Sequence, residues 1–168
     1  MAHAASVNAM LQSEEGISVL TYEDLHIQDI ISSVSDDRAG AIASFIGTTR
    51  NSFKGKVVTR LEYQAYSKAA IKTMSSIIQE ACSLSTRSEH NAEEQQASTI
   101  SRCAVYHRLG TVPVGQPSIV IAVSSPHRKE AFVACEYILE EVKRKAQIWK
   151  REYYEGEPEE TAEWKANH

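Results

Sequence analysis

Residues 118–154 have the sequence SIVIAVSSPHRKEAFVACEYILEEVKRKAQIWKREYY, and this stretch decides the fold. Residues 118–125 are largely apolar on both faces of an extended chain and predict a buried, central strand. From residue 126 to about 147, apolar side chains recur at helical spacing, with Ser125 as the candidate N-cap. Residues 149–154 again have strand composition. The C-terminal third therefore predicts a strand, the longest helix and a second strand in succession.

The rest of the chain predicts more strands and two further helices. Ser67 is the candidate N-cap of the second helix. We expect strands over residues 17–22, 41–50, 57–66 and 100–109, and helices over about 24–34 and 67–81. Strands grouped around three helices, without regular alternation of strand and helix, favour an α+β fold with a mixed or antiparallel sheet over a doubly wound parallel one.

The 168 residues fit one domain of ordinary size. Residues 1–16 are small and polar, and we expect them to form a disordered tail. A single catalytic domain is expected over 17–154, followed by a C-terminal tail over 155–168. Within the domain, residues 85–98 (STRSEHNAEEQQAS) contain no apolar side chain larger than alanine, so they predict a mobile polar insertion.

Composition excludes several classes of function. The formal net charge of −4 provides no overall positive field for nucleic acid, and no apolar run approaches the ~20 residues of a membrane helix. The three cysteines, Cys82, Cys103 and Cys135, lie far apart in sequence, which predicts neither a disulfide framework nor a zinc site. We expect a cytosolic protein without a metal or cofactor.

The start of the long helix is the first candidate site. His127 and Arg128 follow the buried strand directly, at the start of the predicted helix. Unpaired backbone N–H groups and a partial positive charge favour the binding of an anion there. Their side chains add donors suited to phosphate or carboxylate. The alternative is that both are solvated residues of a first helical turn.

The end of the same helix is the second candidate. The basic run comprises Lys143–Lys145 and Lys150–Arg151, and such a run is often no more than a solvated helix end. Trp149 stands beside Lys150, however, and an apolar wall could desolvate the Lys150 amine and lower its pKa. A lysine in that position can act as a base, a nucleophile or a proton donor.

A third candidate is the strand end Gly47-Thr48-Thr49-Arg50, whose hydroxyls and guanidinium could hold an oxyanion or form an ordinary polar turn. Gly55-Lys56 is not a P-loop, because Val57 stands where Ser or Thr is required. His107 lies in an expected strand and is interpreted as a structural residue rather than a catalyst.

Three segments together resemble a known family. They are FIGTTRN at 45–51, VSSPHR at 123–128 and KRKAQIWKRE at 143–152, with HRLG at 107–110 between them. In their order and spacing they resemble the catalytic (large) subunit of molybdopterin synthase, over roughly residues 17–154. The long polar insertion favours a eukaryotic member.

The resemblance implies a hammerhead-like α/β domain and a reaction. Two sulfurs are added to cyclic pyranopterin monophosphate (precursor Z), giving the dithiolene of molybdopterin. The sulfur comes from a small ubiquitin-like subunit whose C-terminal Gly-Gly carries a thiocarboxylate and inserts into a pocket of the large subunit. Molybdenum is inserted later by other proteins, so no metal site is implied here.

The resemblance also implies roles for individual residues. The family's catalytic lysine falls on Lys143 and its second pocket lysine on Lys150. Acid and base roles stay unassigned between them. The substrate-binding positions fall on Thr48, Thr49, Arg50, His127, Arg128, Lys143, Lys150, Arg151 and Glu152.

The spacing of these residues has a geometric consequence. His127 and Lys143 are sixteen residues apart on one predicted helix, which is roughly 24 Å at ~1.5 Å per residue. One small substrate cannot easily reach both in a single chain. Either the helix is broken, or His127 and Arg128 come from a second copy. We therefore predict a homodimer with shared active sites, in keeping with the heterotetramer that the family implies.

Two other classes of function stay open at this point. A non-catalytic module that binds a small anion or nucleotide would use His127 and Arg128 without needing Lys143 and Lys150 in a pocket. A pure interaction subunit would use its groove only to hold the tail of a partner.

Overall fold

The computed structural model describes residues 2–85 and 100–168. A large sheet has the strand order β1-β2-β6-β8-β3, and its strands β2 and β6 are parallel while the other pairs are antiparallel. The strands of this sheet are β1 (Ala9–Gln12), β2 (Gly16–Thr21), β3 (Ala41–Thr48), β6 (Arg102–Arg108) and β8 (Pro117–Ser125).

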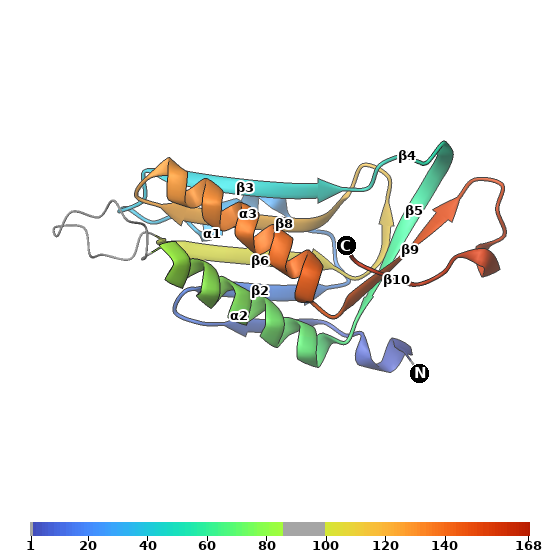
Figure 1. Cartoon of the computed structure of the whole chain (residues 1–168), viewed down its shortest axis with the longest axis horizontal. Coiled ribbons are helices and arrows are strands. Elements are labelled where there is room, and N and C mark those ends of the chain that lie inside the picture. The colour runs from blue at the N-terminus through green and yellow to red at the C-terminus, as the bar shows by residue number, and fades with distance from the viewer. Residues whose placement is uncertain (1, 86–99) are drawn as a thin grey trace.

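A second, antiparallel sheet projects from one end of the first, with β5 and β9 as its long strands (Figure 1). Strand β7 pairs with β5, and the short strands β4 and β10 lie at the edges. The strands of this sheet are β4 (Ser52–Phe53), β5 (Lys56–Ala65), β7 (Gly110–Pro113), β9 (Ile148–Tyr154) and β10 (Lys165–Ala166).

Three α-helices occur in the described residues, α1 (Ile27–Ser33), α2 (Ser67–Ser85) and α3 (Arg128–Lys145). Helices α2 and α3 lie side by side on one face of the large sheet, and α1 packs on the other face against β3, β6 and β8 (Figure 1). Strand β8 is therefore buried on both faces, as its apolar sequence predicted. The predicted α+β class, with a mixed sheet and three helices, is confirmed.

The N-terminal residues differ from the expected disordered tail. Ala2–Ala5 form a short 3-10 turn, and β1 pairs with β2 in antiparallel register. Ser67, predicted as an N-cap, is instead the first residue of α2, and its hydroxyl accepts a hydrogen bond from the Val7 N–H (2.9 Å) and donates one to the Val7 carbonyl (2.7 Å). Backbone pairing orders this segment together with the buried Ser6, whose hydroxyl accepts a hydrogen bond from the Ala65 N–H, and with Leu11, which packs against the core.

The C-terminal residues likewise form structure where the sequence predicted a tail. Glu159–Thr161 make a 3-10 turn, and β10 pairs with β9. The Glu159 carboxylate accepts a hydrogen bond from Arg60 at 2.8 Å, an ion pair with a strand far away in sequence. The predicted mobile insertion at 85–98 lies outside the described residues, apart from Ser85 at the end of α2.

The long helix is shorter at its start than predicted. It begins at Arg128 with His127 as the N-cap, and the Ser125 hydroxyl accepts a long bond (3.4 Å) from the His127 N–H. The helix ends at Lys145 without a break, and Ala146 has extended backbone angles. Among the described residues, no helix is long and apolar enough to cross a membrane.

Candidate active site

A cavity of about 340 Å³ lies where the large sheet meets the projecting one. Its walls come from the end of β3, from β5 and β9, from the last turn of α3 and from the C-terminal residues. Five of the residues that the sequence predicted for the site line it, namely Thr48, Arg50, Lys143, Lys150 and Glu152.

Local structure explains how these side chains converge. Lys143 stands in the last turn of α3, and the chain then turns back into β9. Side chains alternate along a strand, so Lys150 and Glu152 face the cavity while Trp149 and Arg151 point to the other side. On β3, an irregularity in strand pairing between Gly47 and Thr48 ends the regular register next to the cavity.

Lys150 has the environment of a reactive amine. It is half-buried, and this desolvation lowers the pKa of its amine below the usual value. The carboxylate of Glu152 opposes the shift, whereas the positive charges of Lys143, Lys165 and Arg50 reinforce it. Lys150 therefore loses its proton more readily than an exposed lysine.

The cause of this desolvation differs from the prediction. Trp149 was expected to provide the apolar wall, but it is 41% exposed and lies outside the cavity. The apolar lining comes from distant segments of the chain, including Phe45, Leu61 and Tyr63. The expected lowering of the Lys150 pKa is confirmed, but the expected source was wrong because neighbours in a strand face opposite sides.

His107 lines the same cavity and was not predicted to belong to the site. It is only 1% exposed and packs edge-on against Tyr63, with ring centroids 4.9 Å apart. Its Nδ1 is 2.8 Å from the carbonyl oxygen of Arg108, and its Nε2 is 3.2 Å from the side-chain nitrogen of Asn167. Burial lowers the pKa of His107 to about 4, and the positive charge of Lys143 adds to that effect.

Asn167 was also missed, because it belongs to a segment predicted to be a tail. The structure places it in the cavity wall, 9% exposed. Its sequence surroundings are polar and carry no periodic pattern, so only strand pairing reveals its position. For His107, the segment HRLG gave a signal, since it stood between the three segments that carry the resemblance.

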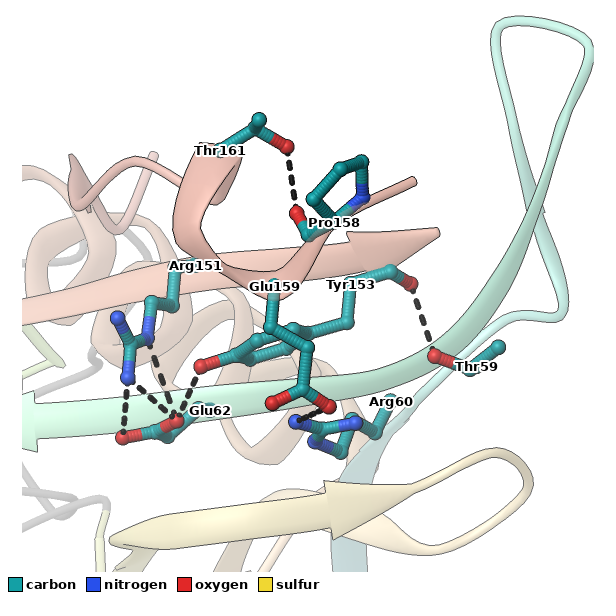
Figure 2. Close-up of polar contacts among 8 residues, drawn as sticks. All are labelled: Thr59, Arg60, Glu62, Arg151, Tyr153, Pro158, Glu159 and Thr161. Atoms are coloured by element: carbon teal, nitrogen blue, oxygen red, sulfur yellow. Dashed lines mark hydrogen bonds and ion pairs between the residues drawn. The ribbon is translucent and has the colours of Figure 1, made fainter. Parts of the chain in front are cut away.

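Two predicted residues lie near the cavity without lining it. Thr49 is 3% exposed, and its hydroxyl points to the Val112 carbonyl at 3.4 Å. Arg151 faces the opposite side of the sheet, where its guanidinium pairs with Glu62 (Figure 2). It also stacks on Trp164, 4.6 Å from the ring centroid. In this chain, both side chains are engaged in structural contacts.

His127 and Arg128 do not line the cavity either. They stand at the opposite end of α3, and the helix between them and Lys143 is continuous. Over sixteen residues at ~1.5 Å each, the separation is roughly 24 Å. The broken-helix alternative is therefore excluded, and the two ends of α3 cannot serve one small molecule within one chain.

The chain matches the family model of the MoaE protein over residues 20–145. This match covers most of the large sheet and all three helices. The chain belongs to the MoaE protein family. The strand β9, which carries Lys150, and the C-terminal residues around Asn167 lie beyond the matched segment.

Named relatives of this MoaE chain are similar over nearly its whole length. The molybdopterin synthase catalytic subunit 2 of Aedes aegypti is 41% identical over 148 residues, which cover 88% of this chain and 87% of the relative. The molybdopterin synthase catalytic subunit of Pyricularia oryzae is 44% identical over 155 residues, 92% of this chain and 76% of the relative. An insect and a fungus agree with the expectation of a eukaryotic member.

Solved structures share the MoaE fold. The molybdopterin synthase from Staphylococcus aureus superposes with a TM-score of 0.72 at 28% identity, over 87% of this chain and 94% of that one. The complex of subunits 1 and 2 of the molybdopterin-converting factor from Helicobacter pylori gives 0.63 at 19% identity, over 83% and 86%. At 19% identity, the likeness to the Helicobacter pylori complex shows a shared fold alone.

Proposed function

We propose that this protein is the catalytic subunit of a molybdopterin synthase. It converts cyclic pyranopterin monophosphate to molybdopterin by adding two sulfurs to the pterin, one from each of two thiocarboxylated C-termini of a small ubiquitin-like subunit, and each terminus is left as a carboxylate. The observation that carries the proposal is the half-buried Lys150 with its lowered pKa, in one cavity with Lys143. The names of relatives that are 41% and 44% identical support the same reaction.

The charges in the cavity suit this chemistry. A thiocarboxylate and a phosphorylated pterin are both anions, and Arg50, Lys143 and Lys150 provide three cations against the single carboxylate of Glu152. Pre-oriented cations stabilise charge that develops during acyl and sulfur transfer. An amine with a lowered pKa, such as that of Lys150, can also move protons while the pterin ring opens.

A second copy of the chain is expected to complete the site. The phosphate-binding candidates His127 and Arg128 stand at the far end of α3, next to two large apolar side chains that are exposed, Phe132 at 67% and Val133 at 56%. Neighbouring exposed apolar side chains are typical of protein interfaces. A homodimer in which this end of α3 lies against the cavity of the partner would bring His127 and Arg128 to that cavity, and two small subunits would complete a heterotetramer.

The cysteines support our proposal of a cytosolic protein. The three cysteines are free thiols in the structure. A reducing environment such as the cytosol keeps them in that state.

The decisive experiment is a reconstituted reaction with thiocarboxylated small subunit and pterin precursor. Lys143→Ala is expected to abolish dithiolene formation while the fold and the binding of the small subunit are retained. Lys145→Ala is the matched control, because this lysine pairs with Glu80 and Glu141 and lies outside the cavity. Unchanged turnover with Lys143→Ala would remove this lysine from the mechanism.

The same variants separate the other two classes of function. An anion-binding module would lose ligand binding when His127 and Arg128 are replaced, but would not depend on Lys143. An interaction subunit would hold the partner tail and form no product even as the wild-type chain.

A further inference from the structure

Asn167 of the C-terminal segment forms part of the cavity wall. Strand β10 pairs with β9, so that Lys165 lies opposite Lys150. The next residue but one, Asn167, donates its backbone N–H to the Ile148 carbonyl at 3.3 Å and directs its side-chain amide to His107. The C-terminus is thus attached to the strand that carries the reactive lysine.

Side chains of the second sheet hold this segment in place. Arg60 of β5 bonds to Glu159 at 2.8 Å, as Figure 2 shows. Further along, the ring of Trp164 stacks on Arg151 of β9. These contacts connect residues 159–164 to both long strands, so the position of Asn167 is supported from several directions.

The hydrogen bonds of His107 define its protonation. A carbonyl oxygen only accepts, so the bond to Arg108 requires the proton to be on Nδ1. Nε2 then has a free lone pair, which accepts the bond from the Asn167 amide. With the Asn167 amide nitrogen directed at Nε2, both ring nitrogens are satisfied in the neutral Nδ1–H tautomer.

A neutral ring matters because of the charges around it. Lys143 approaches from α3, Lys150 and Glu152 line the same cavity from β9, and Arg50 follows β3. From β5, the Tyr63 ring meets the imidazole edge-on. A protonated His107 would add a fourth positive charge to a cavity with one carboxylate, and would repel Lys143 from its place.

We infer that Asn167 is a positioning residue: it holds His107 as the neutral Nδ1–H tautomer in the cavity that Lys143 and Lys150 line, and so makes the C-terminal segment part of the active site. This inference rests on the proposed function for its kinetic consequence, but not for the tautomer itself. Asn167 acts through His107 and does not need to touch the substrate.

The test begins with the full-length chain labelled with ¹⁵N-histidine. In the wild type, we expect Nδ1 of His107 to be protonated and Nε2 unprotonated from about pH 5 to 9, given the low pKa of this buried ring. Asn167→Asp keeps the shape but replaces the donor by an acceptor, so His107 must carry a second proton to retain the bond. The signals of an imidazolium near neutral pH are therefore expected in this variant.

The second readout is kinetic and uses the assembled complex. Asn167→Ala is expected to lower kcat about tenfold with KM changed less than twofold, since a buried acceptor loses its partner. Asn167→Asp should lose activity progressively as the pH falls, because His107 then becomes charged. Glu160→Ala is the matched control, an exposed residue of the same segment outside the cavity, and should behave as the wild type.

The outcomes are distinguishable. Unchanged His107 signals in Asn167→Asp, or an unchanged kcat in Asn167→Ala, would overturn the positioning role while leaving the proposed function intact. A higher kcat in Asn167→Ala would also overturn it, since Asn167 would then obstruct the cavity. If the wild-type complex forms no molybdopterin, the proposed function fails, and the His107 signals still decide whether Asn167 sets the tautomer.

Discussion

The two ends of α3 carry similar cationic residues in different surroundings. At the C-terminal end, Lys143 lines a cavity that is closed by β3, β5, β9 and the chain terminus. At the N-terminal end, His127 and Arg128 meet no cavity wall of their own chain and stand next to exposed Phe132 and Val133. One end is thus a pocket built within a single chain, and the other has the character of an interface.

The comparison shows why the sequence kept both patterns as candidate sites. Helix dipole and local charge depend on a few neighbouring residues, which the sequence contains. Whether a cation lies in a cavity depends on strands that are distant from it in the sequence. The first of the following predictions tests whether the two ends act as one site across a dimer, and the others test which side chains around the cavity take part in the reaction.

The largest effect is expected from complementation between two inactive variants. A chain with His127→Ala and Arg128→Ala, and a chain with Lys143→Ala, should each form dimers with almost no activity. A mixed dimer should regain one intact site of two. In that site, Lys143 of the first chain meets His127 and Arg128 of the second, whereas the other site lacks all three side chains. Product formation measured after subunit exchange checks this, and no recovery at all would contradict shared sites.

The next effect concerns the pH dependence of the reaction. If neutral Lys150 moves the proton, the rate should rise with pH through its lowered pKa, since the amine is charged below that value. Glu152 raises this pKa and Lys165 lowers it. Glu152→Gln should therefore move the acidic limb of the kcat profile to lower pH and Lys165→Met to higher pH. Shifts in the same direction in both variants would argue against Lys150 as the titrating group.

A smaller effect is expected at the face opposite the cavity. Arg151 was predicted to bind substrate, but it does not line the cavity, and its guanidinium forms a partly exposed ion pair with Glu62 (Figure 2). Arg151→Met should reduce the free energy of unfolding by about 1 kcal/mol and leave kcat within about twofold. Denaturant titration and steady-state kinetics measure the two quantities. A fall in kcat of much more than twofold in the folded variant would restore a direct role for Arg151, for instance in the cavity of a second subunit.

The smallest effect is expected at Thr49. Its hydroxyl makes a long bond to the Val112 carbonyl in a buried position. Thr49→Val keeps the shape and should cost about 1 kcal/mol of stability or less, with KM for the pterin precursor unchanged. A marked rise in KM would show that the hydroxyl reaches the substrate.

Much of the fold was accessible from the sequence because its signals are local. The apolar residues of β8 and the periodic stripe of α3 follow from hydrophobic burial at strand and helix spacing. The two ordered ends of the chain, β1 and β10, were not predicted. Their order comes from backbone hydrogen bonds to β2 and β9, and such pairing leaves little trace in segments of only two to four residues.

The candidate site divides in the same way. The sequence by itself determined which cations exist, that Lys143 and His127 share one helix, and that they stand too far apart for one small ligand. Only the tertiary structure decided which side chains face the cavity, because strand alternation sends Lys150 inward and Trp149 outward. It also brought Asn167 to His107 across sixty residues of sequence, a contact that strand pairing and burial create and no local pattern encodes.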